Sequence, residues 1–181
     1  TRLRKECQRV SALNMTRSYA LVGPPGTGKT GMCEHLMTEL CNDGYTLVRC
    51  SLDKRMMGTM LGKVLLTTKM TSKCAILFDD LDQLDIKRKG SDNVGEFLGF
   101  FSALNKSDVP VILFSTVNNP KNVNSTIMGR PERIDEVVPI NTPDVNMTKE
   151  LLCRYGKKNG YSIDADVLED VATELVDLSA S

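Results

Sequence analysis

The sequence has few of the residues that build several common kinds of functional site. Histidine occurs once, at position 35, tryptophan is absent, and aromatic residues make up 5% of the 181 residues. None of the six cysteines is spaced as a CxxC pair, so a zinc site is not expected. The 23 basic side chains are balanced by 23 acidic ones, and no basic–aromatic stripe is present. A nucleic-acid partner is therefore not expected.

Long apolar runs are also missing. No segment has the length of a transmembrane helix, and no signal peptide is recognisable. Most cysteines lie inside apolar stretches, which favours buried free thiols and a reducing, intracellular compartment, the cytoplasm in the first instance. Because the chain begins with threonine rather than methionine, we expect it to be part of a longer protein.

Short apolar runs alternate with segments of helical composition. The expected strands are residues 19–22, 46–52, 74–78, 110–116 and 136–140, and the expected helices are 2–15, 32–42, 58–70, 92–105, 147–157 and 166–178. This alternation predicts an α/β fold, a doubly wound parallel sheet with helices on both faces. Only helices are expected after Pro143, which marks a subdomain boundary.

One stretch is crowded with glycine and proline, the sequence GPPGTGKT at residues 23–30, directly after an apolar strand. Glycines let successive backbone N–H groups curl around a polyphosphate, and the helix that follows adds its positive end. Lys29 is expected to reach the β- and γ-phosphates and Thr30 to ligate Mg²⁺. The alternative is a glycine-rich turn with an incidental lysine. The expected nucleotide-binding residues are Gly23, Pro24, Pro25, Gly26, Thr27, Gly28, Lys29, Thr30 and Gly31.

A second acidic element follows a buried strand, the sequence ILFDDLD at residues 76–82. Carboxylates at a strand end lie at the edge of the sheet where α/β proteins bind ligands. Asp79 is expected to hold Mg²⁺ and Asp80 to orient the attacking water. The alternative is an acidic surface turn. These residues alone indicate a protein that binds Mg-ATP or Mg-GTP.

Together, the two elements resemble the AAA+ ATPases, in the clade with a second region of homology. The resemblance runs from about Ser18 to the end of the chain. It implies a linker helix over residues 1–17, a large nucleotide-binding subdomain with a five-stranded sheet over 18–143, and part of a helical lid over 144–181. It also implies ATP and Mg²⁺ as ligands and a ring, usually a hexamer, of identical or related subunits.

Further motifs of this family follow in order. FSTVNNP, residues 114–120, is similar to the strand that ends in the sensor asparagine, Asn118, with Asn119 as the other register. The segment 128–144 resembles the one that carries the arginine fingers, Arg130 and Arg133, which reach the neighbouring subunit's nucleotide. Glu132 stands where the family usually has glycine. The alternative for both arginines is an ion pair within the chain.

Two departures bear on activity. The family usually has glutamate where this chain has Asp80, a side chain that is shorter by roughly 1.5 Å. A similar pair occurs in the AAA subfamily that includes the mitochondrial translocase of the Rieske protein, so activity is not excluded. The second departure lies in a loop after the second strand. Unfoldases of this clade grip polypeptide there with an aromatic residue, an apolar residue and a glycine, and the matching residues here are Met56, Met57 and Gly58. The alternative is that these methionines pack in the core.

The leading hypothesis is an ATP-hydrolysing motor that forms a ring and remodels or translocates a protein substrate. The first alternative is an ATP-gated assembly switch or scaffold with slow hydrolysis, which is motivated by Asp80. The second is a DNA-handling loader of the same family, which the zero net charge disfavours.

Overall fold

The computed structural model describes residues 2–13, 15–50, 57–84, 92–123, 125–128 and 132–180. Its chain forms two compact units, residues 1–140 and 141–181. Two of the predicted functional residues, Met56 and Arg130, lie outside the described residues.

The first unit is built on a parallel sheet. Its strands are β1 Arg17–Val22, β2 Thr46–Cys50, β3 Cys74–Phe78, β4 Val111–Val117 and β5 Glu136–Pro139, in the order β2-β3-β4-β1-β5. All four strand pairs are parallel. The predicted doubly wound, five-stranded α/β fold is therefore confirmed.

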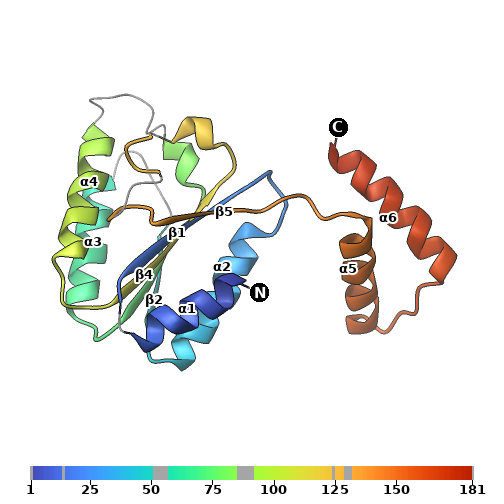
Figure 1. Cartoon of the computed structure of the whole chain (residues 1–181), viewed down its shortest axis with the longest axis horizontal. Helices are drawn as coiled ribbons and strands as arrows, with labels where there is room; N and C mark the ends of the chain where they lie inside the picture. The colour runs from blue at the N-terminus through green and yellow to red at the C-terminus, as the bar shows by residue number, and fades with distance from the viewer. Residues whose placement is uncertain are drawn as a thin grey trace. The chain divides into compact units, whose positions relative to one another are not determined.

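Helices cover both faces of this sheet (Figure 1). The helices are α1 Arg2–Ala12, α2 Lys29–Asn42, α3 Met57–Lys69 and α4 Asp92–Asn105, with short 3₁₀ turns η1 Leu81–Leu84 and η2 Pro120–Asn122. One apolar core joins the sheet to α3 and α4, and a second joins it to α1 and α2. The three-layer arrangement follows from burial of both sheet faces.

The central strands are the most deeply buried. Every residue of β3 and β4 is buried, whereas the edge strands β2 and β5 are partly exposed. Successive side chains alternate between the two cores, as when Ile76 faces α3 and α4 while Leu77 faces α1 and α2. Because β1, β4 and β3 are neighbours, the chain segments that leave their carboxyl ends converge at one place.

The second unit consists of helices α5 Val145–Lys158 and α6 Ala165–Ala180. The Asp144 side chain caps α5 by accepting a hydrogen bond of 2.8 Å from the backbone N–H of Met147. At the other end the backbone N–H of Tyr161 donates to the Gly156 carbonyl at 2.8 Å, which closes the helix. Lys149 and Glu169 pair the two helices. Within the described part of the chain, no helix combines the length and apolar character needed to cross a membrane.

Candidate nucleotide site

The glycine loop connects β1 directly to the first turn of α2. Gly26 and Gly28 have φ angles of 78° and 81°, in the left-handed region that favours glycine. A Cβ atom at either position would meet no atom within 4 Å, so backbone conformation rather than space requires glycine there. Gly28 caps α2 and supplies no side-chain hydrogen bond. The first N–H groups of α2 therefore have no cap side chain, which suits them to an anion.

Gly23 is required for a different reason. A Cβ atom at this position would lie 1.8 Å from the carbonyl oxygen of Ile140, the residue that follows β5. Backbone atoms cannot move aside as a flexible side chain can. The start of the loop is therefore packed tightly against the segment that follows β5 in the same chain. This packing fixes the point at which the loop leaves the sheet.

Lys29 is a buried cation, with 5% of its surface exposed. Its Nζ atom donates to the carbonyl oxygens of Gly23 at 2.8 Å and Pro24 at 2.6 Å. Among the residues that the structure describes, no carboxylate pairs with it. A buried charge that is held only by neutral carbonyls is incompletely compensated. The loop therefore presents a positive centre suited to an anionic ligand.

Asp79 follows β3, and its carboxylate accepts hydrogen bonds from two hydroxyl groups. Its Oδ1 atom accepts hydrogen bonds from the hydroxyls of Thr30 at 2.8 Å and Thr116 at 2.7 Å. Its Oδ2 atom accepts from Arg49 at 3.1 Å. Burial raises the pKa of Asp79, but the hydrogen bonds from Thr116, Thr30 and Arg49 outweigh it and hold the pKa below its usual value. The carboxylate therefore stays ionised at neutral pH.

Asp80 has a different environment although it is the next residue. Its φ angle of 52° is left-handed, and its backbone N–H donates to the Thr116 hydroxyl at 2.8 Å. Amides hold both carboxylate oxygens, Asn118 Nδ2 on Oδ1 at 2.8 Å and Gln83 Nε2 on Oδ2 at 3.0 Å. The non-glycine left-handed backbone costs energy, and it turns the chain away from the direction of β3.

The tip of β4 is fixed by a third carboxylate. Asp82 Oδ1 accepts from the backbone N–H of Asn118 and Oδ2 from that of Asn119, both at 3.0 Å. The Asn119 side chain caps η2 by accepting from the backbone N–H of Lys121 at 3.0 Å. Of the two registers considered for the sensor asparagine, the structure thus places Asn118 beside Asp80.

Arg133 lies half-buried and donates from Nη1 to the Thr126 carbonyl. Among the described residues it makes no ion pair, in contrast to the alternative considered above. Its segment is held by Asp135, whose Oδ2 atom accepts from the Ser18 hydroxyl at 2.9 Å and the Ser18 backbone N–H at 2.8 Å. Glu132, which replaces the usual glycine, has a φ of 70°, so this position keeps the conformation that glycine adopts readily.

Comparison with known proteins decides the family. The model of the ATPase family associated with various cellular activities (AAA) matches residues 19–142. The chain belongs to the AAA family. The predicted AAA membership, the P-loop and the ATPase assignment are therefore confirmed, and ATP binding follows as a property of the family.

Two curated relatives illustrate the likeness. The chain is 26% identical over 195 residues to an ATP-dependent zinc metalloprotease FtsH of Lachnoclostridium phytofermentans, an alignment that covers 98% of the chain and 33% of the relative. It is 29% identical over 163 residues to the probable mitochondrial chaperone bcs1 of Schizosaccharomyces pombe, covering 86% of the chain and 34% of the relative. The chain thus spans about a third of the length of these two AAA proteins.

A solved structure shares the fold. A chain of the E. coli MS115-1 HORMA:CdnC:Trip13 complex superposes with a TM-score of 0.72 at 18% sequence identity, covering 89% of this chain and 59% of that one. At this identity the likeness concerns the AAA fold alone.

Sequence reasoning missed four residues of the candidate site. They are Arg49, Thr116, Asp82 and Gln83. Thr116 had a usable signal, because a polar residue that interrupts a buried apolar strand needs a hydrogen-bond partner. Arg49 had none, since its contact with Asp79 depends on the pairing of β2 with β3.

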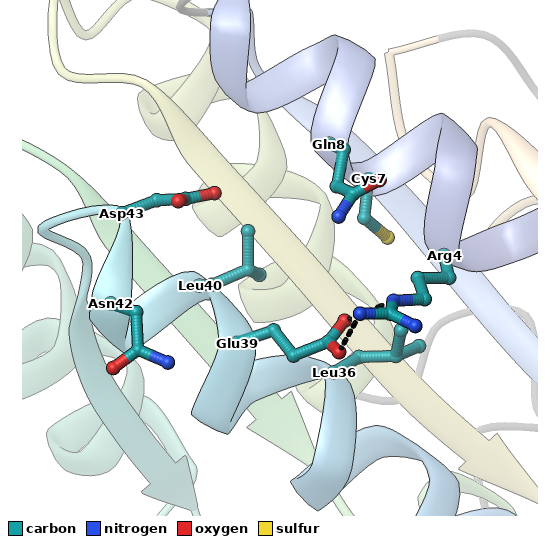
Figure 2. A pocket seen from close by; sticks show the side chains of 8 residues that line it. All are labelled: Arg4, Cys7, Gln8, Leu36, Glu39, Leu40, Asn42 and Asp43. Carbon is teal, nitrogen blue, oxygen red and sulfur yellow. Dashed lines mark hydrogen bonds and ion pairs between the residues drawn. The ribbon is translucent and has the colours of Figure 1, made fainter.

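A separate pocket of about 230 Å³ lies between α1 and α2 (Figure 2). Arg4 of α1 spans it to reach Glu39 of α2, with contacts of 2.9 Å from Nε and 2.7 Å from Nη2. Cys7 is one of its lining residues and is buried, and burial is the main reason that the pKa of this thiol is raised to about 12. None of the pocket residues belongs to the glycine loop or to the segment after β3. The Arg4–Glu39 ion pair therefore connects α1 to α2 at a place separate from the nucleotide site.

Proposed function

We propose that this chain is the motor module of an ATPase that binds Mg-ATP, assembles into a ring and remodels or translocates a protein substrate. The observation that carries the proposal is the buried Lys29 of the glycine loop, to which the described residues offer two carbonyl oxygens and no carboxylate. A polyphosphate would supply the anion that this cation lacks, and the N–H groups at the start of α2 would bind its oxygens.

The residues present fit Mg²⁺ as well. This ion prefers hard oxygen ligands, and the Thr30 hydroxyl and Asp79 carboxylate lie 2.8 Å apart with the carboxylate ionised. Thr30 would ligate the ion and Asp79 would hold it directly or through water. When bound, Mg²⁺ would supply neutralisation of the charge that develops on the phosphates.

In this proposal, Asp80 and Asn118 act on the attacking water. Asp80 accepts the water's hydrogen bond and turns it toward the γ-phosphate, while the Asn118 amide fixes Asp80 at 2.8 Å.

Assembly into a ring rests on the arginine segment. Arg133, and Arg130 outside the described residues, would enter the nucleotide site of a neighbouring copy or a related subunit and stabilise the transferred phosphoryl group. To do so, Arg133 has to leave the Thr126 carbonyl that it contacts within its own chain. Substrate polypeptide would meet Met56 and Met57.

We also propose that the protein works in a reducing, intracellular compartment, most simply the cytoplasm. All six cysteines are free, and four of them are buried. Burial raises the pKa of Cys33 and of Cys50 to about 12, so these thiols stay protonated and unreactive.

The testing experiment is ATP turnover per subunit of the full chain as a function of protein concentration. A ring with shared sites predicts a rate that rises steeply and then saturates, and Arg133→Ala should abolish turnover while nucleotide binding stays within about two-fold. A constant, non-zero rate at all concentrations, or normal turnover by Arg133→Ala, would refute the shared site.

A second candidate, the ATP-gated switch with slow hydrolysis, is favoured by the two amides that occupy both oxygens of Asp80. The Asp80→Glu variant separates the two functions. A turnover gain of about ten-fold or more would support the switch, because the longer carboxylate would restore reach that the natural chain lacks. No gain in turnover would support the motor, with an active-site geometry that already suits the shorter aspartate side chain.

A further inference from the structure

Arg49 links two carboxylates at the metal side of the site. It lies on edge strand β2, and its Nη2 atom contacts Asp79 Oδ2 at 3.1 Å while its Nη1 atom contacts Glu34 of α2. Thr30, which contacts the other oxygen of Asp79, lies one helical turn before Glu34. Helix α2 therefore holds Asp79 twice, directly through Thr30 and indirectly through Glu34 and Arg49.

The guanidinium changes the charge that a metal ion would meet. Asp79 is the carboxylate suited to Mg²⁺, and Arg49 already binds one of its oxygens. Arg49 neutralises part of the negative charge of Asp79, and Glu34 offsets part of the charge of Arg49. A divalent ion at this carboxylate therefore has to share it with a fixed cation.

We propose that Arg49 sets the Mg²⁺ requirement of nucleotide binding by competing with the metal for the charge of Asp79, and that Glu34 moderates this competition. The inference rests on the proposed Mg-ATP site. Its effect is modest, because the Arg49 side chain is 58% exposed and water screens its charge.

Two variants shift the charge in opposite directions. Arg49→Gln leaves two uncompensated carboxylates, so the Mg²⁺ concentration for half-maximal nucleotide affinity should fall by roughly three- to ten-fold. Glu34→Gln leaves Arg49 to act on Asp79 alone, so the same concentration should rise by about two- to three-fold. Arg49→Lys keeps the charge and loses the two-pronged geometry, so its Mg²⁺ requirement should stay near that of the natural chain.

The measurement is binding of a fluorescent, non-hydrolysable ATP analogue to the full chain across a MgCl₂ series and in EDTA. Arg4→Gln is the matched control, because it also removes an arginine that pairs with a glutamate of α2, away from the site. Thermal melts in EDTA without nucleotide establish that each variant is folded.

Opposite shifts for Arg49→Gln and Glu34→Gln, with near-normal binding in EDTA and no shift for Arg4→Gln, are the expected result. An unchanged Mg²⁺ requirement in Arg49→Gln overturns the inference. So does a large loss of affinity in EDTA, which would make Arg49 a direct phosphate ligand. A shift in Arg49→Lys as large as that in Arg49→Gln also overturns it, because the effect would then depend on the guanidinium geometry rather than on the charge. If the natural chain binds no analogue even at saturating Mg²⁺, the proposed function itself fails.

Discussion

The two sides of the candidate site use different chemistry around adjacent carboxylates. On the hydroxyl side, Asp79 is held by two threonine hydroxyls and an arginine, and its pKa is lowered. On the amide side, Asp80 is held by the side-chain amides of Gln83 and Asn118. A left-handed backbone at Asp80 separates them, because it turns the second carboxylate away from the line of β3.

This difference assigns separate tasks to neighbouring residues. Hydroxyls and an ionised carboxylate suit a metal ion and therefore binding, whereas a carboxylate oriented by amides suits a water molecule and therefore turnover. Among the described residues, only Thr116 contacts both sides, since its hydroxyl donates to Asp79 and accepts from the backbone N–H of Asp80. Substitutions should then separate binding from turnover, except at the loop that serves both sides and at Thr116.

The largest effect is expected at the loop. Lys29→Ala removes the buried cation on which both sides depend, so nucleotide affinity should fall by at least about 100-fold and turnover should vanish. Fluorescent-nucleotide titration measures the affinity, and Lys63→Ala, an exposed lysine of α3, is the control. Retention of affinity within ten-fold would show that the backbone N–H groups suffice without the cation.

A smaller effect, confined to the amide side, is expected at Asp82. Asp82→Asn replaces one acceptor by a donor, so one of the two backbone N–H groups at the tip of β4 loses its partner. Turnover should fall by about 10- to 100-fold while nucleotide affinity changes less than two-fold. Steady-state kinetics together with nucleotide titration make the test, with the exposed Asp108→Asn as control. Equal losses of affinity and turnover would show that the two sides of the site do not act separately.

Much of this comparison could be predicted from the sequence. The glycine loop, the acidic strand end and the alternation of elements are local patterns, so Lys29, Thr30 and Asp79 could be named before the fold was known. The expected strand 74–78 has the observed bounds of β3, because a continuous apolar run between polar residues has clear ends.

The rest depends on topology and backbone conformation. Arg49 and Thr116 reach Asp79 across 30 and 37 residues of sequence, contacts that arise only because β3 lies between β2 and β4. No glycine signals the left-handed conformation of Asp80, whereas at Glu132 the glycine that the family usually has there was a usable signal. Tertiary contacts impose these conformations against the local preference.

The residue that joins the sides should show a combined effect. Thr116→Val keeps the shape but removes the shared hydroxyl, so both affinity in Mg²⁺ and turnover should fall by roughly five-fold, and stability by about 1–3 kcal/mol. Thr116→Ser should restore most of each. Ser115→Ala is the matched control, because the adjacent Ser115 hydroxyl is buried and has no hydrogen-bond partner among the described residues. Its loss should leave stability nearly unchanged in urea unfolding. A loss of turnover alone would assign Thr116 to the amide side.

The smallest effect is expected at Gln83, and its direction distinguishes it from Asp82. Gln83 is exposed, and its amide occupies the Asp80 oxygen that Asn118 leaves free. A carboxylate oxygen can accept two hydrogen bonds, so an attacking water bound to this oxygen would share it with Gln83, which would then compete with the water rather than position it. Gln83→Ala should therefore raise turnover by about two-fold without changing affinity, because an exposed hydrogen bond contributes little. Single-turnover kinetics would measure this gain, and a ten-fold loss instead would mean that both amides are needed to aim Asp80.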